Sequence, residues 1–288
     1  MAVIVQILQT IERIMPDAIV DFLFAVMMHK KRHGVFPKII KPETFNEKIL
    51  HRKLFDRRKL LTQFADKYRV RDYVENKLGS EILPKLYFVT TNPFDIPFDE
   101  LPNKFVVKPS HGSGWVRVVA DKSELNKADL INTCISWLNQ SYYKIYREWV
   151  YKNIEPRIII EEFIDDGSEG TPNDYKLYVF HGKVEIMYVI AGRYTELRLN
   201  FYDRFWNQLD AALRFKKTGE PVKRPKHLDE MIRAAEVLGE DIDFIRADFY
   251  DTEEKIYFGE ITNTPGCGWG CFNPLEFDRY LGGLWELT

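Results

Sequence analysis

Cysteine is scarce in this chain, and its scarcity excludes one class of fold. The 288 residues include three cysteines, Cys134, Cys267 and Cys271. So small and odd a number gives no disulfide framework and fits a reducing compartment, so we expect a cytoplasmic protein, with the inner face of the membrane as a second location. Cys267 and Cys271 make a poor zinc site, because no second cysteine pair or histidine pair lies near them in the sequence.

An excess of charge of one sign is also missing. The 41 basic and 43 acidic residues give a formal net charge of −2. Nucleic-acid binding relies on a basic surface, so this balance gives no support to a nucleic-acid partner. The chain is long enough for two or three compact units.

Long uncharged hydrophobic runs are absent as well. Charged residues interrupt the apolar stretch 1–28, namely Glu12, Arg13, Asp17 and Asp21, so we expect no transmembrane segment there. The stretch also lacks the basic start and the cleavage site of a signal peptide. One helical stripe holds Ile4, Ile7, Leu8, Ile11 and Ile14. This stripe predicts either a helix packed on the body or a helix that docks on a membrane surface or a partner enzyme.

Helical patterns come first in the chain, and extended patterns dominate later. Residues 1 to 82 read as helical, with a capping box from Thr44 to Glu47 and a helix over Leu60–Lys77. Further helices are predicted over Asp129–Tyr146 and Leu228–Leu238. Predicted strands are Leu86–Val89, Phe105–Lys108, Trp115–Val119, Arg157–Ile164, Tyr175–Phe180, Val184–Ile190, Phe244–Tyr250 and Lys255–Glu260. The pattern predicts an α+β class with antiparallel sheets.

The first stretch with chemical character is Phe105–Gly114, with the sequence FVVKPSHGSG. Lys108 ends a strand, and the loop after it has little side-chain bulk, so backbone N–H groups can approach a polyphosphate. Neither the Walker pattern nor a strand–GxGxxG–helix pattern is present. The stretch predicts a phosphate cradle between two strands. The alternative is a hairpin whose glycines serve only the turn.

A second stretch, Ile158–Ile164, is an apolar strand that ends in Glu161 and Glu162. The backbone of such a strand end can bond an adenine edge, and a carboxylate can accept a hydrogen bond from the exocyclic amine. Asp166 or Glu169 could then reach a ribose hydroxyl. The alternative is a strand end that simply faces solvent.

The third stretch, Arg246–Gly266, is the most informative, because it contains an acidic residue on each of two neighbouring predicted strands. If the two strands pair as a hairpin, these residues, Asp248 and Glu260, lie opposite each other. Two close carboxylates repel unless they share a proton or a hard cation such as Mg²⁺. Arg246 lies two residues before Asp248 and so points to the same face, where it can pair with Asp248 or with phosphate. The alternative is a hairpin held by salt bridges.

Taken in order, these stretches resemble the ATP-grasp superfamily, and most closely its subgroup named for the teichuronopeptide biosynthesis protein (TupA-like). The residues that carry the resemblance are Lys41–Lys48, Ala65–Tyr73, Phe105–Gly114, Asp174–Lys176 and Asp248–Gly266. The resemblance implies an ATP-grasp fold, in which two α+β subdomains grip ATP, preceded by a mainly helical region. We therefore expect a helical N-terminal region at 1–100, a subdomain with the Gly-rich loop and hinge at 101–168, and a subdomain with the metal site at 169–288.

The resemblance also implies roles for single residues. ATP would be bound by Lys67, Lys108, Ser110, His111, Gly112, Ser113, Gly114, Glu161, Glu162, Phe163 and Ile164, with Glu169 as a further contact. Mg²⁺ would be bound by Asp248 and Glu260, with Thr262 or Asn263 as the third ligand, because Thr262 stands where the superfamily has Asn. Catalytic candidates are Lys176, Arg193 and Arg246, and the alternative for the first two is ordinary surface charge.

The function that the resemblance implies is an ATP- and Mg²⁺-dependent carboxylate–amine ligase acting through an acyl phosphate. The acceptor would be a carboxylate, such as a uronic acid of a bacterial capsular or cell-wall polysaccharide, and the donor an amino acid or other amine. No nucleophilic side chain is needed, and the sequence has no GxSxG elbow. Two alternatives stay open: a phosphotransferase or glycan kinase, and a non-catalytic nucleotide-binding partner of a glycan-assembly complex docked through residues 1–28.

Overall fold

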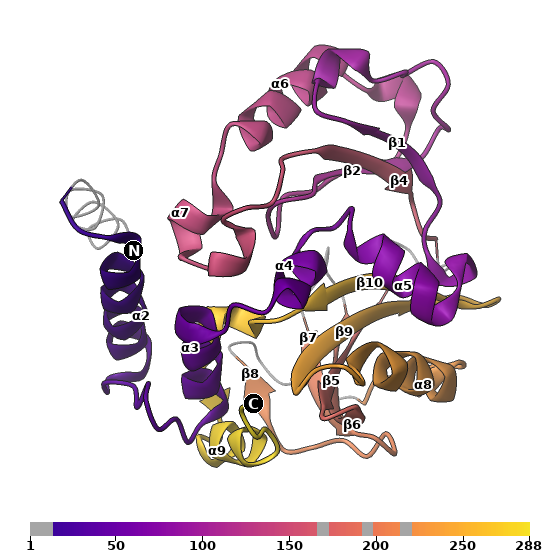
Figure 1. Ribbon diagram of the computed structural model, residues 1–288. Coiled ribbons are helices and arrows are strands. Elements are labelled where there is room, and N and C mark those ends of the chain that lie inside the picture. The colour runs from indigo at the N-terminus through magenta and orange to yellow at the C-terminus, as the bar shows by residue number, and fades with distance from the viewer. Residues whose placement is uncertain (1–13, 166–172, 192–197, 214–220) are drawn as a thin grey trace.

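The computed structural model describes residues 14–165, 173–191, 198–213 and 221–288. Two antiparallel sheets face each other across the middle of the molecule (Figure 1). The strands are β1 Leu86–Thr90, β2 Phe105–Pro109, β3 Arg117–Val119, β4 Ile158–Glu162, β5 Asp174–Phe180, β6 Lys183–Ala191, β7 Arg198–Asp203, β8 Ala212–Leu213, β9 Phe244–Asp251, β10 Ile256–Thr262 and β11 Phe272–Asn273. The helices are α2 Asp17–His33, α3 Phe45–Phe55, α4 Lys59–Ala65, α5 Val70–Leu78, α6 Lys127–Leu138, α7 Tyr142–Tyr146, α8 Leu228–Gly239 and α9 Glu276–Gly283.

The smaller sheet has the strand order β1-β4-β2-β3. Burial alternates along β2: Phe105 and Val107 are fully buried, whereas Val106 and Lys108 are half-buried. The buried residues belong to a core that includes Leu130 of α6, which covers this side of the sheet (Figure 1). Because side chains alternate along a strand, Val106 and Lys108 face the other sheet.

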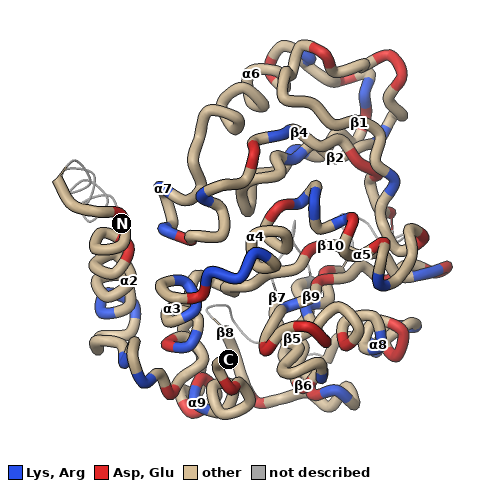
Figure 2. Tube along the Cα trace, in the orientation of Figure 1, with Lys and Arg blue, Asp and Glu red and all other residues tan. Residues whose placement is uncertain are grey.

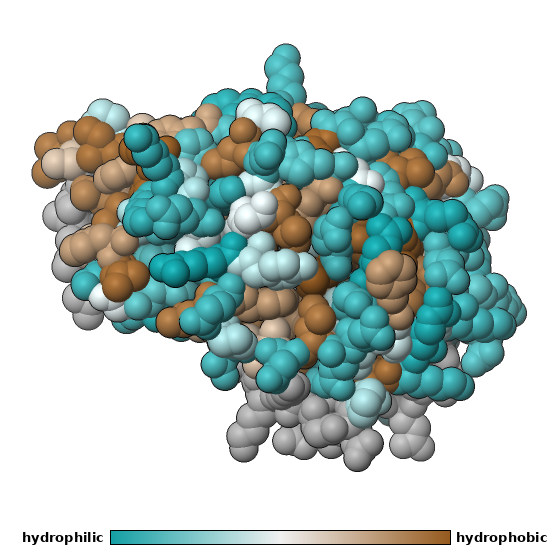
Figure 3. Space-filling model, turned by 90° about the horizontal axis from the view of Figure 1, so that it is seen from below, coloured by the Kyte–Doolittle hydropathy of each residue, from teal (hydrophilic) through white to brown (hydrophobic). Residues whose placement is uncertain are grey.

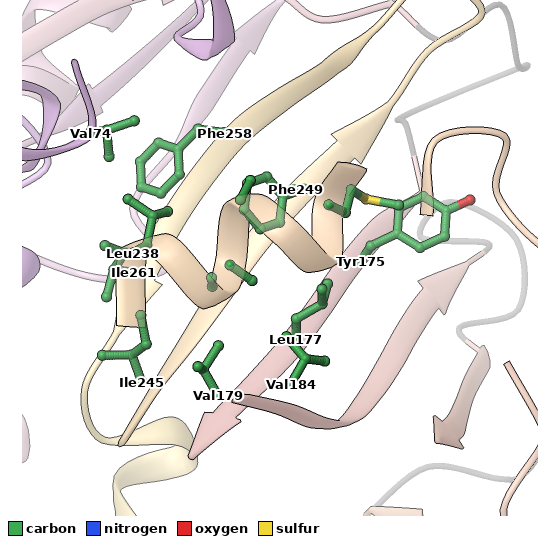
Figure 4. Close-up of a cluster of buried hydrophobic side chains, with 14 of the residues drawn as sticks. Val74, Tyr175, Leu177, Val179, Val184, Leu238, Ile245, Phe249, Phe258 and Ile261 are labelled. Carbon is green, nitrogen blue, oxygen red and sulfur yellow. The ribbon is translucent and has the colours of Figure 1, made fainter. Parts of the chain in front are cut away.

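The larger sheet has the order β10-β9-β5-β6-β7. One face packs on α8, where Leu177, Leu238 and Phe249 belong to the largest buried cluster (Figure 4). The expected helix over Leu228–Leu238 is therefore confirmed as α8, which ends one residue later. The expected pairing of the last two long strands is also confirmed, since β9 and β10 form an antiparallel pair.

The helical N-terminal region differs from the expectation in one place. The capping box from Thr44 to Glu47 is confirmed at the start of α3. The single helix expected over Leu60–Lys77 is wrong, because α4 ends at Ala65 and α5 begins at Val70. Asp66 leaves the helical conformation, and its Oδ1 accepts hydrogen bonds from the N–H groups of Tyr68 and Arg69 at 2.9 and 3.2 Å. This side chain competes with the helix for backbone donors and so ends α4.

The helix expected over Asp129–Tyr146 is likewise divided. Helix α6 ends at Leu138 and α7 begins at Tyr142, after Ser141, whose side chain accepts a hydrogen bond from the N–H of Lys144. Strand β1 pairs with β4, although the predicted boundary at residue 100 leaves β1 in the N-terminal region. The three-part division of the chain stays a proposal.

Helix α2 is attached to the body by polar contacts. The hydroxyl of Tyr143 donates to both carboxylate oxygens of Asp21, at 3.1 and 3.0 Å, and Arg147 lies 3.5 Å from the same carboxylate. Seen from below, hydrophobic side chains gather at the end of the molecule where α2 lies (Figure 3), and exposed residues there include Ile19 and Phe22.

Within the described ranges, no helix is both long and apolar enough to cross a membrane. Of the predicted stripe from Ile4 to Ile14, Ile14 is exposed, and the other four residues lie outside the described residues.

A buried ion pair joins α3 to the start of β9. Arg52 Nη2 lies 2.6 Å from Asp243 Oδ1, and both side chains are 1% exposed. Asp243 also accepts from Arg58 at 2.7 Å and from the indole N–H of Trp285 at 2.8 Å. A carboxylate with these donors compensates the buried charge of Arg52.

We expect Asp243→Ala to lower the free energy of unfolding by about 3–5 kcal/mol, because Arg52 would stay buried without its nearest carboxylate and keep only Asp56, 3.7 Å away. Urea denaturation followed by circular dichroism measures this change. Asp241→Ala is the matched control: the Asp241 side chain is 53% exposed and pairs with Lys77, so the loss should stay below about 1 kcal/mol. Equal losses in the two variants would contradict the structural role of the buried pair.

Candidate functional site

A cavity of about 650 Å³ lies between the two sheets. Its apolar lining includes Val106, Val118, Phe163, Ile190 and Phe258. A second, smaller cavity of about 170 Å³ shares lining residues with it, among them Lys67, Lys108 and Glu260. Figure 2 shows basic and acidic residues on the elements that face each other here. The site therefore combines an apolar compartment with a strongly charged end.

The break between α4 and α5 places Lys67 at this charged end. Its backbone N–H donates to Ser110 O at 3.1 Å, and its Nζ donates to Gly112 O at 2.7 Å. The Nζ atom also lies 3.8 Å from Glu260 Oε2. Lys67 thus connects the Gly-rich loop to the carboxylate on β10, a position that an unbroken helix would not give it.

The Gly-rich loop divides into two parts. Ser110 and His111 are buried and turned into the protein: Ser110 Oγ donates to Glu155 O at 3.1 Å, and His111 Nε2 lies 3.0 Å from Trp137 O. Ser113 and Gly114 line the cavity instead. A Cβ atom on Gly112 would lie 2.5 Å from the ring of Trp115, so this position needs glycine. Of the predicted loop contacts, the structure brings Ser113 and Gly114 to the cavity and anchors the loop through Ser110 and His111.

The predicted hinge at the end of β4 lines the cavity through Glu161, Glu162, Phe163 and Ile164. Glu161 is paired with Lys108 and lies 3.9 Å from Arg71 Nη1. Glu162 accepts a hydrogen bond from the N–H of Lys85 at 3.0 Å. Sequence reasoning missed Arg71, although it lies within the Ala65–Tyr73 stretch that carries the resemblance.

Asp248 and Glu260 are directly opposite each other on β9 and β10, as expected. The register depends on a bulge: Phe258 pairs with Phe249, and after Gly259 the pairing shifts so that Glu260 meets Asp248. Without the shift Gly259 would oppose Asp248, and Glu260 would point to the other face of the sheet. A glycine inside a strand pattern is the sequence signal that indicates such a bulge.

Three oxygen atoms converge on one nitrogen of the Arg246 guanidinium. Its Nη2 atom lies 2.6 Å from Asp248 Oδ2, 2.9 Å from Glu260 Oε1 and 2.9 Å from Thr262 Oγ1. Lys176 pairs with Asp248 and lies 2.7 Å from Asp174. Arg246 therefore faces the same side as Asp248, and Lys176 is a buried part of this cluster rather than surface charge.

Burial and neighbouring charges shift the pKa values of Asp248 and Glu260 in opposite net directions. Burial raises the pKa of Asp248 to about 6, against the opposing effect of Arg246 and Lys176. Burial acts in the same direction on Glu260, but Lys67 and Arg246 outweigh it and hold the pKa of Glu260 well below its usual range. Both groups are therefore mainly ionised at neutral pH.

The side chains of Thr262 and Asn263, the two candidates for the third oxygen ligand, point in different directions. Thr262 Oγ1 lies 3.2 Å from Glu260 Oε1, and Thr262 lines the smaller cavity. The amide of Asn263 donates to Leu61 O at 2.7 Å, on the other side of the strand. Thr262 is thus the side chain that the structure brings to the carboxylate pair.

The donor set at this point fits Mg²⁺, which prefers hard oxygen ligands and often takes one or two carboxylates together with substrate phosphates. One cationic nitrogen, Nη2 of Arg246, already has three oxygen neighbours, which belong to Asp248, Glu260 and Thr262. In the described part of the chain, no group of three or more His, Cys, Asp or Glu side chains is gathered for a metal. A metal bound here would need further oxygens from a ligand. The candidates Asp166, Glu169 and Arg193 lie outside the described residues.

Solved structures with a similar fold include ATP-grasp ligases. D-alanine–D-alanine ligase from Bacillus anthracis in complex with ATP is 19% identical over 72% of this chain and 56% of that chain, with a TM-score of 0.43. The D-alanine–D-alanine ligase from Helicobacter pylori is 21% identical over 77% and 60%, with a TM-score of 0.42. A RiPP-associated ATP-grasp ligase from Chryseobacterium gregarium, in complex with ADP and a leader and core peptide, is 14% identical over 83% and 66%, with a TM-score of 0.43. The chain spans less than two thirds of the length of each, and no curated protein matches it.

A family model gives the stronger match. The model described as TupA-like ATPgrasp matches residues 47–286, which include the break at Lys67, the Gly-rich loop, the hinge and the β9–β10 pair. The resemblance seen in the sequence and the expected α+β, ATP-grasp fold are both confirmed by this match. The chain therefore belongs to the TupA-like ATP-grasp family.

Proposed function

We propose that this chain is an ATP-dependent ligase that joins a carboxylate to an amine through an acyl phosphate. The observation that carries the proposal is the meeting of Lys67, Lys108 and Arg246 with Asp248 and Glu260 where the two cavities share their charged lining. Cationic side chains offset the charge that develops on a transferring phosphoryl group. Two carboxylates on paired strands suit a metal–nucleotide complex.

The larger cavity is the proposed nucleotide site. Its apolar walls, from Val106 and Val118 on one sheet to Ile190 and Phe258 on the other, suit a flat base. Ser113 and Gly114 would bring loop backbone close to the phosphates. Mg²⁺ held by Asp248, Glu260 and Thr262 would supply positive charge at those phosphates.

The proposed chemistry balances without a nucleophile from the protein. A carboxylate oxygen of the acceptor takes the γ-phosphoryl group of ATP, and ADP leaves. The amine nitrogen then attacks the acyl carbon, the C–N bond forms, the C–O bond to phosphate breaks, and phosphate leaves with the electron pair. The attacking amine loses one proton, which the departing phosphate takes up. No protein nucleophile is needed, and Lys67, Arg246 and Lys176 bind and orient charged groups.

The family resemblance suggests the acceptor and donor to try first. We propose a carboxylate of a bacterial surface polysaccharide, such as a uronic acid, and an amino acid or other amine. The test is ADP release from ATP and Mg²⁺ with uronic-acid oligosaccharides and amines, each alone and together. ADP release that needs both partners supports the ligase, whereas a phosphorylated product formed without any amine would identify a phosphotransferase.

We expect Gly112→Ala to weaken the binding of Mg²⁺·AMPPNP by about tenfold, because its Cβ would collide with the ring of Trp115 and displace the loop. Isothermal titration calorimetry measures the dissociation constant. Gly283→Ala is the matched control, because a Cβ there meets nothing within 4 Å and the residue ends α9, outside the lining of both cavities. Unchanged affinity in Gly112→Ala would contradict a loop role in nucleotide binding.

A further inference from the structure

The smaller cavity has a second charged feature besides the cluster of Lys67, Arg246, Glu260 and Thr262, which we call the phosphate-facing cluster because the proposed function places phosphate there. Glu148 lines this cavity and is 4% exposed. Its Oε1 accepts a hydrogen bond from Cys267 Sγ at 3.1 Å, and its Oε2 accepts one from the hydroxyl of Thr264. Both donors are neutral, and Glu148 has no ion-pair partner in the described part of the chain.

A buried carboxylate without a cation is costly, and a carboxylate can accept more than two hydrogen bonds. The lining of this cavity also includes aromatic side chains. Tyr142 and Tyr151 line the same cavity, with ring centroids 4.6 Å apart and planes at 55°. Aromatic faces beside a carboxylate are the surroundings that bind an ammonium group.

The backbone holds Glu148 firmly in this place. Arg147, the residue before it, has a φ of 53°, in the left-handed region that non-glycine residues rarely adopt. Cys267, which donates to Glu148, has a φ of 59°. Arg147 is buried and lies 3.5 Å from Asp21 of α2, so contacts with α2 fix the turn that delivers Glu148 to the cavity.

The same cavity reaches the phosphate-facing cluster, because Lys67, Arg246, Glu260 and Thr262 also line it. Its volume of about 170 Å³ is roughly a quarter of the 650 Å³ of the larger cavity. The smaller cavity therefore suits the smaller of the two substrates.

We propose that the smaller cavity binds the amine substrate, a small molecule whose protonated amino group is bound by Glu148, with Tyr142 and Tyr151 lining the same cavity. This inference rests on the proposed ligase function and assigns the amine to one of its two cavities. The amine must lose a proton before it attacks an acyl carbon, and Glu148 is a carboxylate at that place which can accept it.

The test compares amines with hydroxyl counterparts of the same shape. Dissociation constants for alanine against lactate, and for ethanolamine against ethylene glycol, are measured by saturation-transfer NMR with the full chain and Mg²⁺·AMPPNP. We expect the wild type to prefer each amine at least about tenfold, since a charge-assisted hydrogen bond in a buried site is worth roughly a 10- to 150-fold change in affinity. Glu148→Gln should lose this preference and bind lactate as before. The control Glu253→Gln, whose side chain is 92% exposed, should keep it.

Two results would overturn the inference: a wild type that does not favour amines over their hydroxyl counterparts, or a Glu148→Gln variant that folds and keeps the preference. The wild-type comparison decides the matter even if Glu148→Gln fails to fold. Binding of Mg²⁺·AMPPNP is measured in the same samples. Loss of nucleotide binding in the wild type would count against the proposed function itself, whereas normal nucleotide binding without amine preference would count against the Glu148 site alone.

Discussion

Glu260→Gln is expected to lower the rate of ATP turnover by a factor on the order of 1,000, with little change in stability. The carboxylate of Glu260 is the point where Lys67, Arg246 and the proposed metal meet, at 3.8 Å from Lys67 Nζ and 2.9 Å from Arg246 Nη2. An amide of the same shape removes the negative charge and keeps the packing. The buried guanidinium of Arg246 keeps its two contacts with the carboxylate of Asp248, so the substitution leaves no unpaired buried charge behind.

The rate is measured as ADP release with saturating partners, and the fold is checked by thermal unfolding. Glu253→Gln serves as the control for the change from Glu to Gln on the surface and should turn over ATP like the wild type. Turnover within tenfold of the wild type in Glu260→Gln would mean that β10 does not supply a catalytic carboxylate. It would also favour a non-catalytic nucleotide-binding role for the chain.

Lys67→Ala is expected to weaken Mg²⁺·AMPPNP binding by roughly 10- to 150-fold, the range of one charge-assisted hydrogen bond. Lys67 is held by two contacts to the Gly-rich loop, so its ammonium group has a defined position above the charged end of the cavity. Loss of the side chain removes a cation and also frees the loop carbonyl of Gly112.

Isothermal titration calorimetry gives the affinity of this variant, and Lys59→Ala is the control. Lys59 begins α4, is exposed, and does not line either cavity. Equal affinities in the two lysine variants would show that the break between α4 and α5 has no role in nucleotide binding. The result for Lys67 does not depend on the identity of the proposed acceptor.

The pairing of β9 with β10 could be predicted from the sequence, but its register could not. Two apolar strands joined by a short polar turn predict an antiparallel pair, and the charges of Asp248 and Glu260 predict a cation between them. The exact opposition of the two residues depends on the bulge at Gly259, whose position a period of two along the strand does not indicate. The pairing was predictable from the pattern, but its register came from a local irregularity.

Lys67 illustrates the reverse case. The charged and apolar residues from Leu60 to Lys77 have helical spacing, and local spacing gives no reason for the helix to stop at Ala65. The stop comes from the side chain of Asp66, which bonds the next backbone N–H groups, and from the carbonyl of Ser110, which accepts from Lys67 N. The second of these contacts joins residues far apart in the sequence, and such contacts cannot be read from periodicity.

Glu148 could not be recognised at all from the sequence. It lies in a polar, aromatic stretch, and its partners Thr264 and Cys267 are more than a hundred residues away. Only the folded chain brings the three groups together at a cavity. The buried position of this carboxylate is therefore information that the structure adds to the family resemblance.

The most direct test of a metal–nucleotide site between the two sheets is a calorimetric titration of the wild-type chain with AMPPNP, with and without Mg²⁺. We expect one binding site for AMPPNP, with a dissociation constant between about 1 μM and 1 mM in the presence of Mg²⁺. Without the metal, the affinity should be at least about tenfold weaker. Glu260→Gln should lose most of this metal dependence. No binding at millimolar nucleotide, or binding that is equally tight without Mg²⁺, would contradict the assignment of the cavity between the two sheets as a metal–nucleotide site.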